Sequence, residues 1–145
     1  MTSTAASSAE PSGPWDLVLS HVSLSRRRGG ERIVLWLNGS GAPGWSVAYT
    51  DRPVLDGSGE AVDLPGEIFL DIYVSGTVPA GDGYRGGRRV TAADPGRVSG
   101  LHVAGTFEGY TQVLAGIDGD RVPFRVRALR DPSRLVVDVG VGSSP

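Results

Sequence analysis

The chain has 145 residues, of which 39% are hydrophobic and 21% are charged, a composition typical of one globular domain rather than of a disordered protein. Its formal net charge of −2 argues against a nucleic-acid-binding protein, because such proteins usually carry an excess of basic residues. All 14 basic residues are arginine and no cysteine is present, which excludes catalysis by lysine or by a thiol, disulfide bonds and zinc–cysteine sites.

Residues 1–14 are rich in serine, alanine, proline and glycine, and we expect them to form a flexible N-terminal tether. After this segment, short apolar runs of period two alternate with turn residues, a pattern typical of strands rather than helices. About eight strands are expected, in the segments 17–24, 32–38, 45–50, 68–74, 99–107, 110–117, 124–128 and 134–139. The sequence therefore predicts an all-β domain over residues 15–140, an antiparallel β-sandwich, followed by a tail at residues 141–145.

The alternation of side chains also predicts what the outer faces of the sheets carry. In the segment 68–74 it directs Ile72 inward and the aromatic side chains of Phe69 and Tyr73 outward. Because half-exposed aromatic side chains usually complete a core, we expect a loop to cover them, with direct binding as the alternative. Near the end of the chain, the same alternation directs Arg125 and Arg127 outward. Arg134 begins the last expected strand, and we expect Asp138 to pair with Arg134 or with a neighbouring arginine.

The segment 79–96 is rich in glycine and arginine and has no clear period, so we interpret it as a long excursion between strands. The candidate binding residues lie within it and are Tyr84, Arg85, Arg88 and Arg89. An aromatic plane beside guanidinium groups suits sugars and anions, and muramyl peptides offer both as carbohydrates that carry carboxylates. The alternative interpretation of this segment is a solvated, mobile loop.

Catalytic patterns are weak throughout the sequence. His21 and His102, the two imidazoles, each fall inside an expected strand, which favours histidines on a sheet face over a general base. Two matches to the G-x-G-x-x-G pattern, at residues 39–44 and 81–86, precede no expected helix and are interpreted as turns. We therefore predict a protein that is not an enzyme, with no catalytic residue, no metal site and no cofactor.

Two other functions stay open on the residues alone. The 16 acidic residues could include a carboxylate pair of the glycoside-hydrolase type, although no pattern selects one. A closed barrel that carries a small apolar ligand, with Trp15, Trp36 and Trp45 at its mouth, is the other alternative.

Four segments carry a family resemblance. They are R-I-V-L at residues 32–35, P-G-W-S-V-A-Y at 43–49, F-E-G at 107–109, and P-F-R-V followed by D-P-S-R-L-V-V-D-V within 123–139. In these segments the chain resembles the AMIN-like domain of actinobacterial exported proteins and lipoproteins. The resemblance extends over roughly residues 17–139, and the closing motif is the most specific part of it.

The resemblance implies a β-sandwich related to the AMIN domain, which occurs beside cell-wall amidases and in secretins of the envelope and acts in peptidoglycan binding. It therefore implies an extracytoplasmic, non-catalytic protein that binds cell-wall glycan or an envelope protein, while the net charge argues against nucleic acid as a partner. Members of the family typically begin with a signal peptide, often with a lipobox cysteine, and the sequence shows neither. It also contains no apolar run long enough to span a bilayer, so the chain is expected to be either cytoplasmic or a trimmed exported form.

Overall fold

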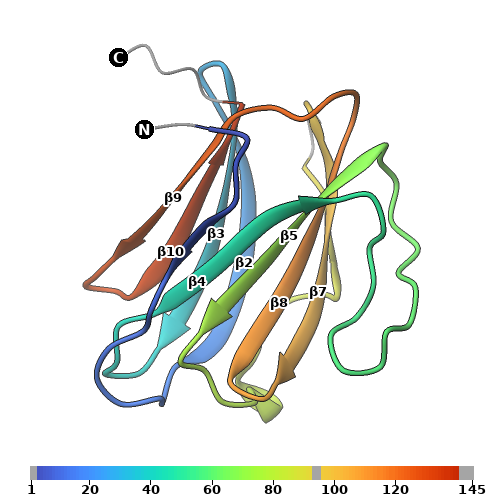
Figure 1. Ribbon diagram of the computed structural model, residues 1–145. Coiled ribbons are helices and arrows are strands. Elements are labelled where there is room, and N and C mark those ends of the chain that lie inside the picture. Colours follow the sequence, from blue (N-terminus) through green and yellow to red (C-terminus); the bar gives the residue numbers. More distant parts are fainter. Residues whose placement is uncertain (1–2, 93–95, 141–145) are drawn as a thin grey trace.

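The computed structural model describes residues 3–92 and 96–140, and in these residues ten strands form two antiparallel sheets (Figure 1). The elements are β1 (Ser7–Ala9), β2 (Val18–Arg27), β3 (Gly30–Asn38), β4 (Gly44–Thr50), β5 (Ile68–Ser75), the 3-10 turn η1 (Gly81–Gly83), β6 (Arg89–Val90), β7 (Val98–Phe107), β8 (Tyr110–Ile117), β9 (Phe124–Leu129) and β10 (Arg134–Val139). The eight predicted strands correspond to β2–β5 and β7–β10, while the short strands β1 and β6 were not predicted.

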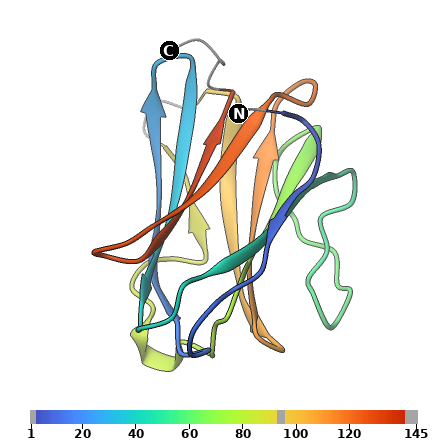
Figure 2. The ribbon, with the colours of Figure 1, turned by 60° about the vertical axis from the view of Figure 1, so that its left-hand side comes forward.

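The larger sheet has the strand order β1-β4-β5-β8-β7-β6, and the smaller sheet has the order β2-β3-β10-β9. The two sheets face each other as layers, as the two ribbon views show (Figures 1 and 2). Between them lies one apolar core to which alternate residues of both sheets contribute, among them Leu35, Ile72, Val113 and Val137, all fully buried. The predicted all-β sandwich is therefore confirmed.

The three tryptophans do not share the mouth of a cavity. Trp15 is 53% exposed, Trp45 packs against the core, and Trp36 alternates with the core residues Leu35 and Leu37 and so lies on the outer face of the smaller sheet. The strands form two separate sheets rather than one closed sheet. The alternative of a closed barrel with these tryptophans at its mouth is therefore wrong.

The N-terminal segment, which we expected to be a tether, lies against the domain over its described part. Ser7–Ala9 pairs with residues 45–47 of β4, and the indole Nε1 of Trp45 donates a hydrogen bond to Ser7 Oγ at 3.0 Å. Farther upstream, Ser3 forms a bridge with Phe124 at the start of β9. The segment has little apolar content, so its sequence gave no sign of strand β1. The expected tail at residues 141–145 lies outside the described residues.

The long connection 51–67 covers part of the outer face of the larger sheet, as the green segment in Figure 1 indicates. Phe69, 7% exposed, packs beneath Leu64 of this connection. Gly116 lies directly beneath the carbonyl oxygen of Pro65, where a Cβ atom would overlap that oxygen. The prediction that a loop covers the outward aromatic side chains of this sheet is thus confirmed for Phe69.

One side chain fastens this connection to the sheet. Gln112 accepts a hydrogen bond from the backbone N–H of Asp56 at 3.0 Å, and its Nε2 donates to the carbonyl oxygen of Val54 at 3.0 Å. The same Nε2 lies 2.9 Å from Asp71 Oδ1 and 3.2 Å from the hydroxyl oxygen of Tyr73. Burial raises the pKa of Asp71, and its effect exceeds that of the hydrogen bonds from Gln112 and Tyr73, which lower the pKa.

In the described residues, no helix has the length and hydropathy that crossing a membrane requires.

Candidate functional site

The glycine- and arginine-rich excursion runs from β5 to β7 across one open side of the sandwich. Its backbone is anchored to both sheets. The N–H of Arg85 donates to the carbonyl oxygen of Ser20 in β2 at 2.5 Å, and the carbonyl oxygen of Arg88 accepts from the N–H of Val103 in β7 at 2.7 Å. Strand β6 then pairs with residues 101–102 of β7. The excursion therefore bridges the smaller and the larger sheet.

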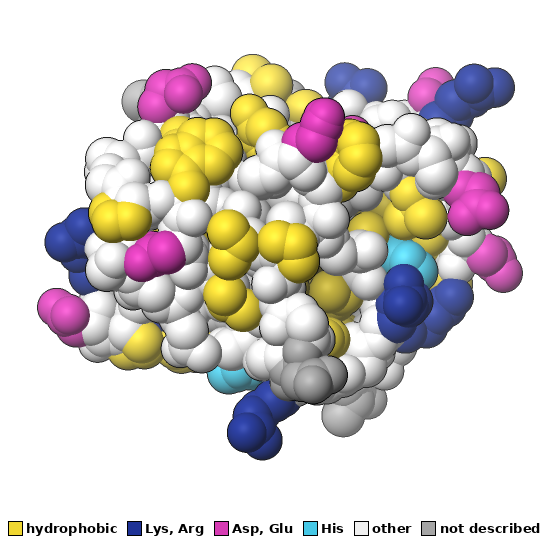
Figure 3. Space-filling view, turned by 90° about the horizontal axis from the view of Figure 1, so that it is seen from below, with side chains coloured by type: hydrophobic (Ala, Val, Ile, Leu, Met, Phe, Trp, Pro, Cys, Tyr) yellow, Lys and Arg dark blue, Asp and Glu magenta, His cyan; other side chains and the backbone are white. Residues whose placement is uncertain are grey.

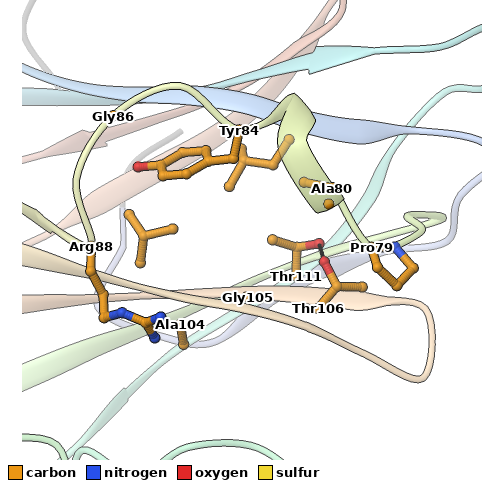
Figure 4. Close-up of a pocket in the computed structure, with 12 residues that line it drawn as sticks. Pro79, Ala80, Tyr84, Gly86, Arg88, Ala104, Gly105, Thr106 and Thr111 are labelled. Atoms are coloured by element: carbon orange, nitrogen blue, oxygen red, sulfur yellow. Dashed lines mark hydrogen bonds between the residues drawn. The ribbon is translucent and has the colours of Figure 1, made fainter.

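Beneath the excursion lies a cavity of about 330 Å³. Leu19 and Val103 give it apolar walls, while Tyr84, Arg88 and Thr106 contribute polar groups (Figure 4). This volume is at the lower end of the range for small-molecule sites, which is about 300–1,000 Å³. The cavity can therefore hold one compact group rather than an extended ligand.

Tyr84 forms one side of the cavity, and its ring is held in place. The hydroxyl group donates a hydrogen bond to the carbonyl oxygen of Gly87 at 2.8 Å, which closes a small loop within the excursion. The side chain packs partly against the core, and burial raises the pKa of its hydroxyl group. Figure 4 shows the ring lying along the cavity, so this aromatic surface is positioned before any ligand arrives.

Arg88 reaches the rim of the cavity near Ala104 (Figure 4). Its guanidinium group forms no hydrogen bond or ion pair with any residue in the described part of the chain. Burial and the charges of Arg88 and Arg89 lower the pKa of His102, which lies on β7 opposite Arg89. Since no described residue occupies its donors, Arg88 is a cation suited to binding an anion.

The other two predicted site residues do not line the cavity. Arg85 is exposed, and its hydrogen bond to the described residues comes from its backbone N–H. Arg89 donates from its guanidinium group to the carbonyl oxygen of Asp63 at 2.7 Å. Arg89 therefore ties the excursion to the connection 51–67. Of the four candidates, the structure brings Tyr84 and Arg88 together at the cavity and places Arg85 and Arg89 outside it.

A chain of threonine hydroxyl groups, which the sequence analysis missed, borders the cavity. The Oγ1 atoms of Thr106 and Thr111 lie 2.6 Å apart, and Thr111 donates to Thr77 Oγ1 at 2.9 Å. Thr77 in turn donates to the carbonyl oxygen of Gly109 at 3.2 Å. Thr106 and Thr111 lie opposite each other in the β7–β8 hairpin. The predicted hairpin register could have shown that these two threonines meet.

The end of the sandwich near this cavity carries exposed apolar side chains. Trp15 lies against Gly109 at the tip of the β7–β8 hairpin, and Phe107 and Tyr110 on either side of that tip are 46% and 40% exposed. Val78, also exposed, donates its N–H to the carbonyl oxygen of Leu17. Figure 3 looks onto this end and shows hydrophobic side chains gathered there.

A model of the AMIN-like domain family matches residues 17–141. The chain belongs to the AMIN-like domain family. The match extends from the residue before β2 to beyond β10 and so includes the whole smaller sheet. No curated protein and no solved structure matches the chain.

In this AMIN-like domain, two of the segments that carried the resemblance meet in an ion cluster. Arg32 of β3 donates from Nε to Asp138 Oδ1 of β10 at 2.7 Å, and Arg127 and Arg125 of β9 approach Asp138 Oδ2 at 3.3 and 3.5 Å. Burial raises the pKa of Asp138, but the hydrogen bonds and charges of the three arginines outweigh burial and hold it below its ordinary value. The cluster joins three neighbouring strands of the smaller sheet.

Trp36 is the centre of a second side-chain cluster on the outer face of the smaller sheet. The ring of His21 stacks on it with centroids 5.3 Å apart, and the guanidinium carbon of Arg134 lies 5.7 Å from its centroid. Arg134 also donates to the carbonyl oxygens of Arg130 and Pro132 and so closes the β9–β10 turn. The sequence left open whether Asp138 pairs with Arg134 or with a neighbouring arginine, and the structure pairs it with the neighbours. His21 lies on a sheet face, as predicted.

Proposed function

We propose that this AMIN-like domain is a non-catalytic module of the bacterial cell envelope, located outside the cytoplasm, that holds peptidoglycan-type glycan. Membership of the family supports the envelope setting, because the related AMIN domain acts in peptidoglycan binding. The domain then works by attachment, keeping the protein that contains it at the cell wall.

One observation carries the choice of glycan: the same cavity is lined by the fixed ring of Tyr84 and by Arg88, whose guanidinium group has no partner among the described residues. An aromatic ring packs against the C–H face of a sugar, and a guanidinium group binds a carboxylate through two parallel hydrogen bonds. Muramyl sugars and their peptides contain both groups. Among neutral and anionic glycans, this pairing favours one that carries carboxylates.

The lining of the cavity supports a binding role rather than hydrolysis. The residues that the structure describes there include no aspartate, glutamate or histidine, and so no general acid or base of the usual kind. The hydroxyl groups of Thr106 and Thr111 already bond to each other. Hydroxyl groups without an adjacent base are weak nucleophiles.

Co-sedimentation with purified cell-wall sacculi tests the proposal. We expect the protein to sediment with sacculi. Arg88→Ala should bind at least about tenfold more weakly, because it loses the charge-assisted hydrogen bonds to the carboxylate. Arg85→Ala is the matched control, because it removes the same charge from the same excursion but outside the cavity. Equal retention of Arg88→Ala and the unaltered protein would contradict the assignment of the cavity, and release of soluble muropeptides would contradict the non-catalytic role.

A further inference from the structure

Strand β9 lies at the margin of the smaller sheet, with β10 on one side (Figure 1). On its other side, the described residues form one residue pair, between Ser3 and Phe124. The N–H of Phe124 donates to the carbonyl oxygen of Ser3 at 2.8 Å, and the N–H of Ser3 donates back to Phe124 at 3.1 Å. This pair fixes the direction in which the backbone groups of β9 point.

In antiparallel strands, successive residues direct their N–H and C=O groups to opposite sides. Since Phe124 directs both groups away from β10, Val126 and Ala128 direct theirs the same way. Neither residue has a backbone or side-chain hydrogen bond to any described residue on that side. Two donors and two acceptors of β9 therefore point to the same side as those of Phe124, and no described residue pairs with them.

The space beside residues 124–127 of this edge forms a groove of about 760 Å³ between residues 3–8 and β9. Neighbouring strands need about 4.8 Å between them, and natural edges are usually blocked by proline, a bulge or a covering segment. Residues 124–129 contain no proline, and the register of β9 against β10 has no irregularity. The edge therefore lacks these two obstacles to a further strand.

The charges along this edge indicate which strand fits. Arg125 and Arg127 lie on the outer face on either side of Val126. Their Nε atoms are shielded from solvent and have no acceptor, and Asp138, which both contact, is already shared with Arg32. A carboxylate at every second position of an added strand would lie opposite these two arginines.

A second copy of the chain fits this edge poorly. In a symmetric antiparallel pair, the β9 strands of two copies lie side by side. The outward N–H and C=O groups of Val126 and Ala128 in one copy must then bond to Phe124, Val126 or Ala128 of the other copy. In each of these registers, an Arg125 or Arg127 side chain lies directly opposite one of the same two arginines, and like charges in that position are destabilising. The edge therefore favours a different, acidic chain.

We propose that the free edge of β9 receives an extended acidic segment of a partner protein as an added strand of the smaller sheet. Backbone hydrogen bonds to Val126 and Ala128 provide the affinity, and alternate carboxylates facing Arg125 and Arg127 provide the selectivity. No lining residue of the glycan cavity takes part, so this interaction can exist whether or not the cavity binds glycan.

The probe is a capped peptide of about eight residues in which glutamate and valine alternate, long enough to pair along the strand. We expect binding to slow hydrogen exchange at the amides of Val126 and Ala128 specifically. Ala128→Pro removes an outward N–H without breaking a β9–β10 hydrogen bond and should weaken peptide binding about tenfold, whereas Ala128→Val keeps the N–H and should bind normally.

Two altered peptides test the same edge without changing the protein. Lysine in place of glutamate should weaken binding by reversing the charges, and N-methylation of alternate peptide amides should abolish it by removing the donors. Binding that tolerates N-methylation, or that leaves exchange at Val126 and Ala128 unchanged, would overturn the proposal even if Ala128→Pro proved unstable.

Discussion

Arg32 and Asp138 are 106 positions apart in the sequence, yet they lie directly opposite each other in β3 and β10, joined by a hydrogen bond of 2.7 Å from Nε to Oδ1. Asp138 is 1% exposed, whereas the side chains of Arg32, Arg125 and Arg127 are 29–39% exposed. One buried carboxylate thus compensates part of the charge of three partly solvated guanidinium groups. The stability of the smaller sheet should depend on that carboxylate.

Asp138→Asn tests this dependence. The variant keeps the shape of the side chain but leaves three clustered arginines without a counter-charge, so the free energy of unfolding should fall by about 3 kcal/mol, as when one partner of a buried pair is removed. Urea unfolding measures it. Asp120→Asn, a change at an exposed aspartate, should stay within about 0.5 kcal/mol of the unaltered protein. Similar losses in both variants would refute a specific role for the cluster.

The stability of the domain should also fall in acid through Asp138. Its folded-state pKa is lowered, so its contribution is fully present above the unfolded-state pKa of about 3.9 and is lost as the pH falls through the lower folded-state value. Between about pH 5 and about pH 2, the unaltered protein should therefore lose more free energy of unfolding than Asp138→Asn does. If the free energies of unfolding of the unaltered protein and of Asp138→Asn fell by the same amount, Asp138 would have the same pKa in the folded and the unfolded state, which would contradict this prediction.

Gln112→Leu should release the connection 51–67 from the larger sheet. The change removes the hydrogen bonds to Asp56 and Val54, so hydrogen exchange at the Asp56 amide should accelerate about tenfold or more. Exchange in the β2–β3 ladder should change far less. Ser58→Ala, which removes only a local hydrogen bond to Glu60, serves as the control in the same connection. Unchanged exchange at Asp56 would mean that packing alone holds the connection.

Tyr49→Phe should lower the free energy of unfolding, because it removes two hydrogen bonds to the backbone of Val122. The Tyr49 hydroxyl group donates to the carbonyl oxygen of Val122 at 2.6 Å and accepts from the Val122 N–H at 3.0 Å. Its loss leaves both backbone groups unpaired, at a cost of about 1–3 kcal/mol measured by thermal unfolding. Tyr110→Phe, at a 40% exposed tyrosine, should have little effect. An equal effect of the two changes would contradict this account.

The strands that the sequence predicted are those whose own pattern alternates. Strand β10 has apolar residues at positions 135, 137 and 139, and its predicted bounds, 134–139, coincide with those in the structure. Strands β1 and β6 have three and two residues, too few for a period, and they exist because β4 and β7 offer free edges. Their positions depend on tertiary neighbours rather than on local sequence.

The candidate site, too, could be predicted from the sequence only in part. An aromatic residue beside arginines marked the excursion as the candidate segment, and the structure places Tyr84 and Arg88 in the lining of the cavity. The sequence could not separate Arg88 from Arg89, because that distinction arises where the excursion crosses β7 and Asp63 comes within reach. For a related reason, the sequence allowed Asp138 to pair with a neighbouring arginine but could not show that three arginines gather around it. Alternation directed Arg125 and Arg127 outward, but only the strand order β3-β10-β9 brings them to one carboxylate.

The bridge between Ser3 and Phe124 also places the N-terminal segment at one end of the sandwich. Gly140 donates its N–H to the carbonyl oxygen of Pro123, so Ser3 and Gly140 are bonded to adjacent residues at the start of β9. Both lie at the end of the sandwich opposite η1, next to which the cavity opens (Figure 1). Whichever of the two ends is joined to an anchor, another domain or a sensor chip, the cavity lies at the far end of the sandwich from the attachment.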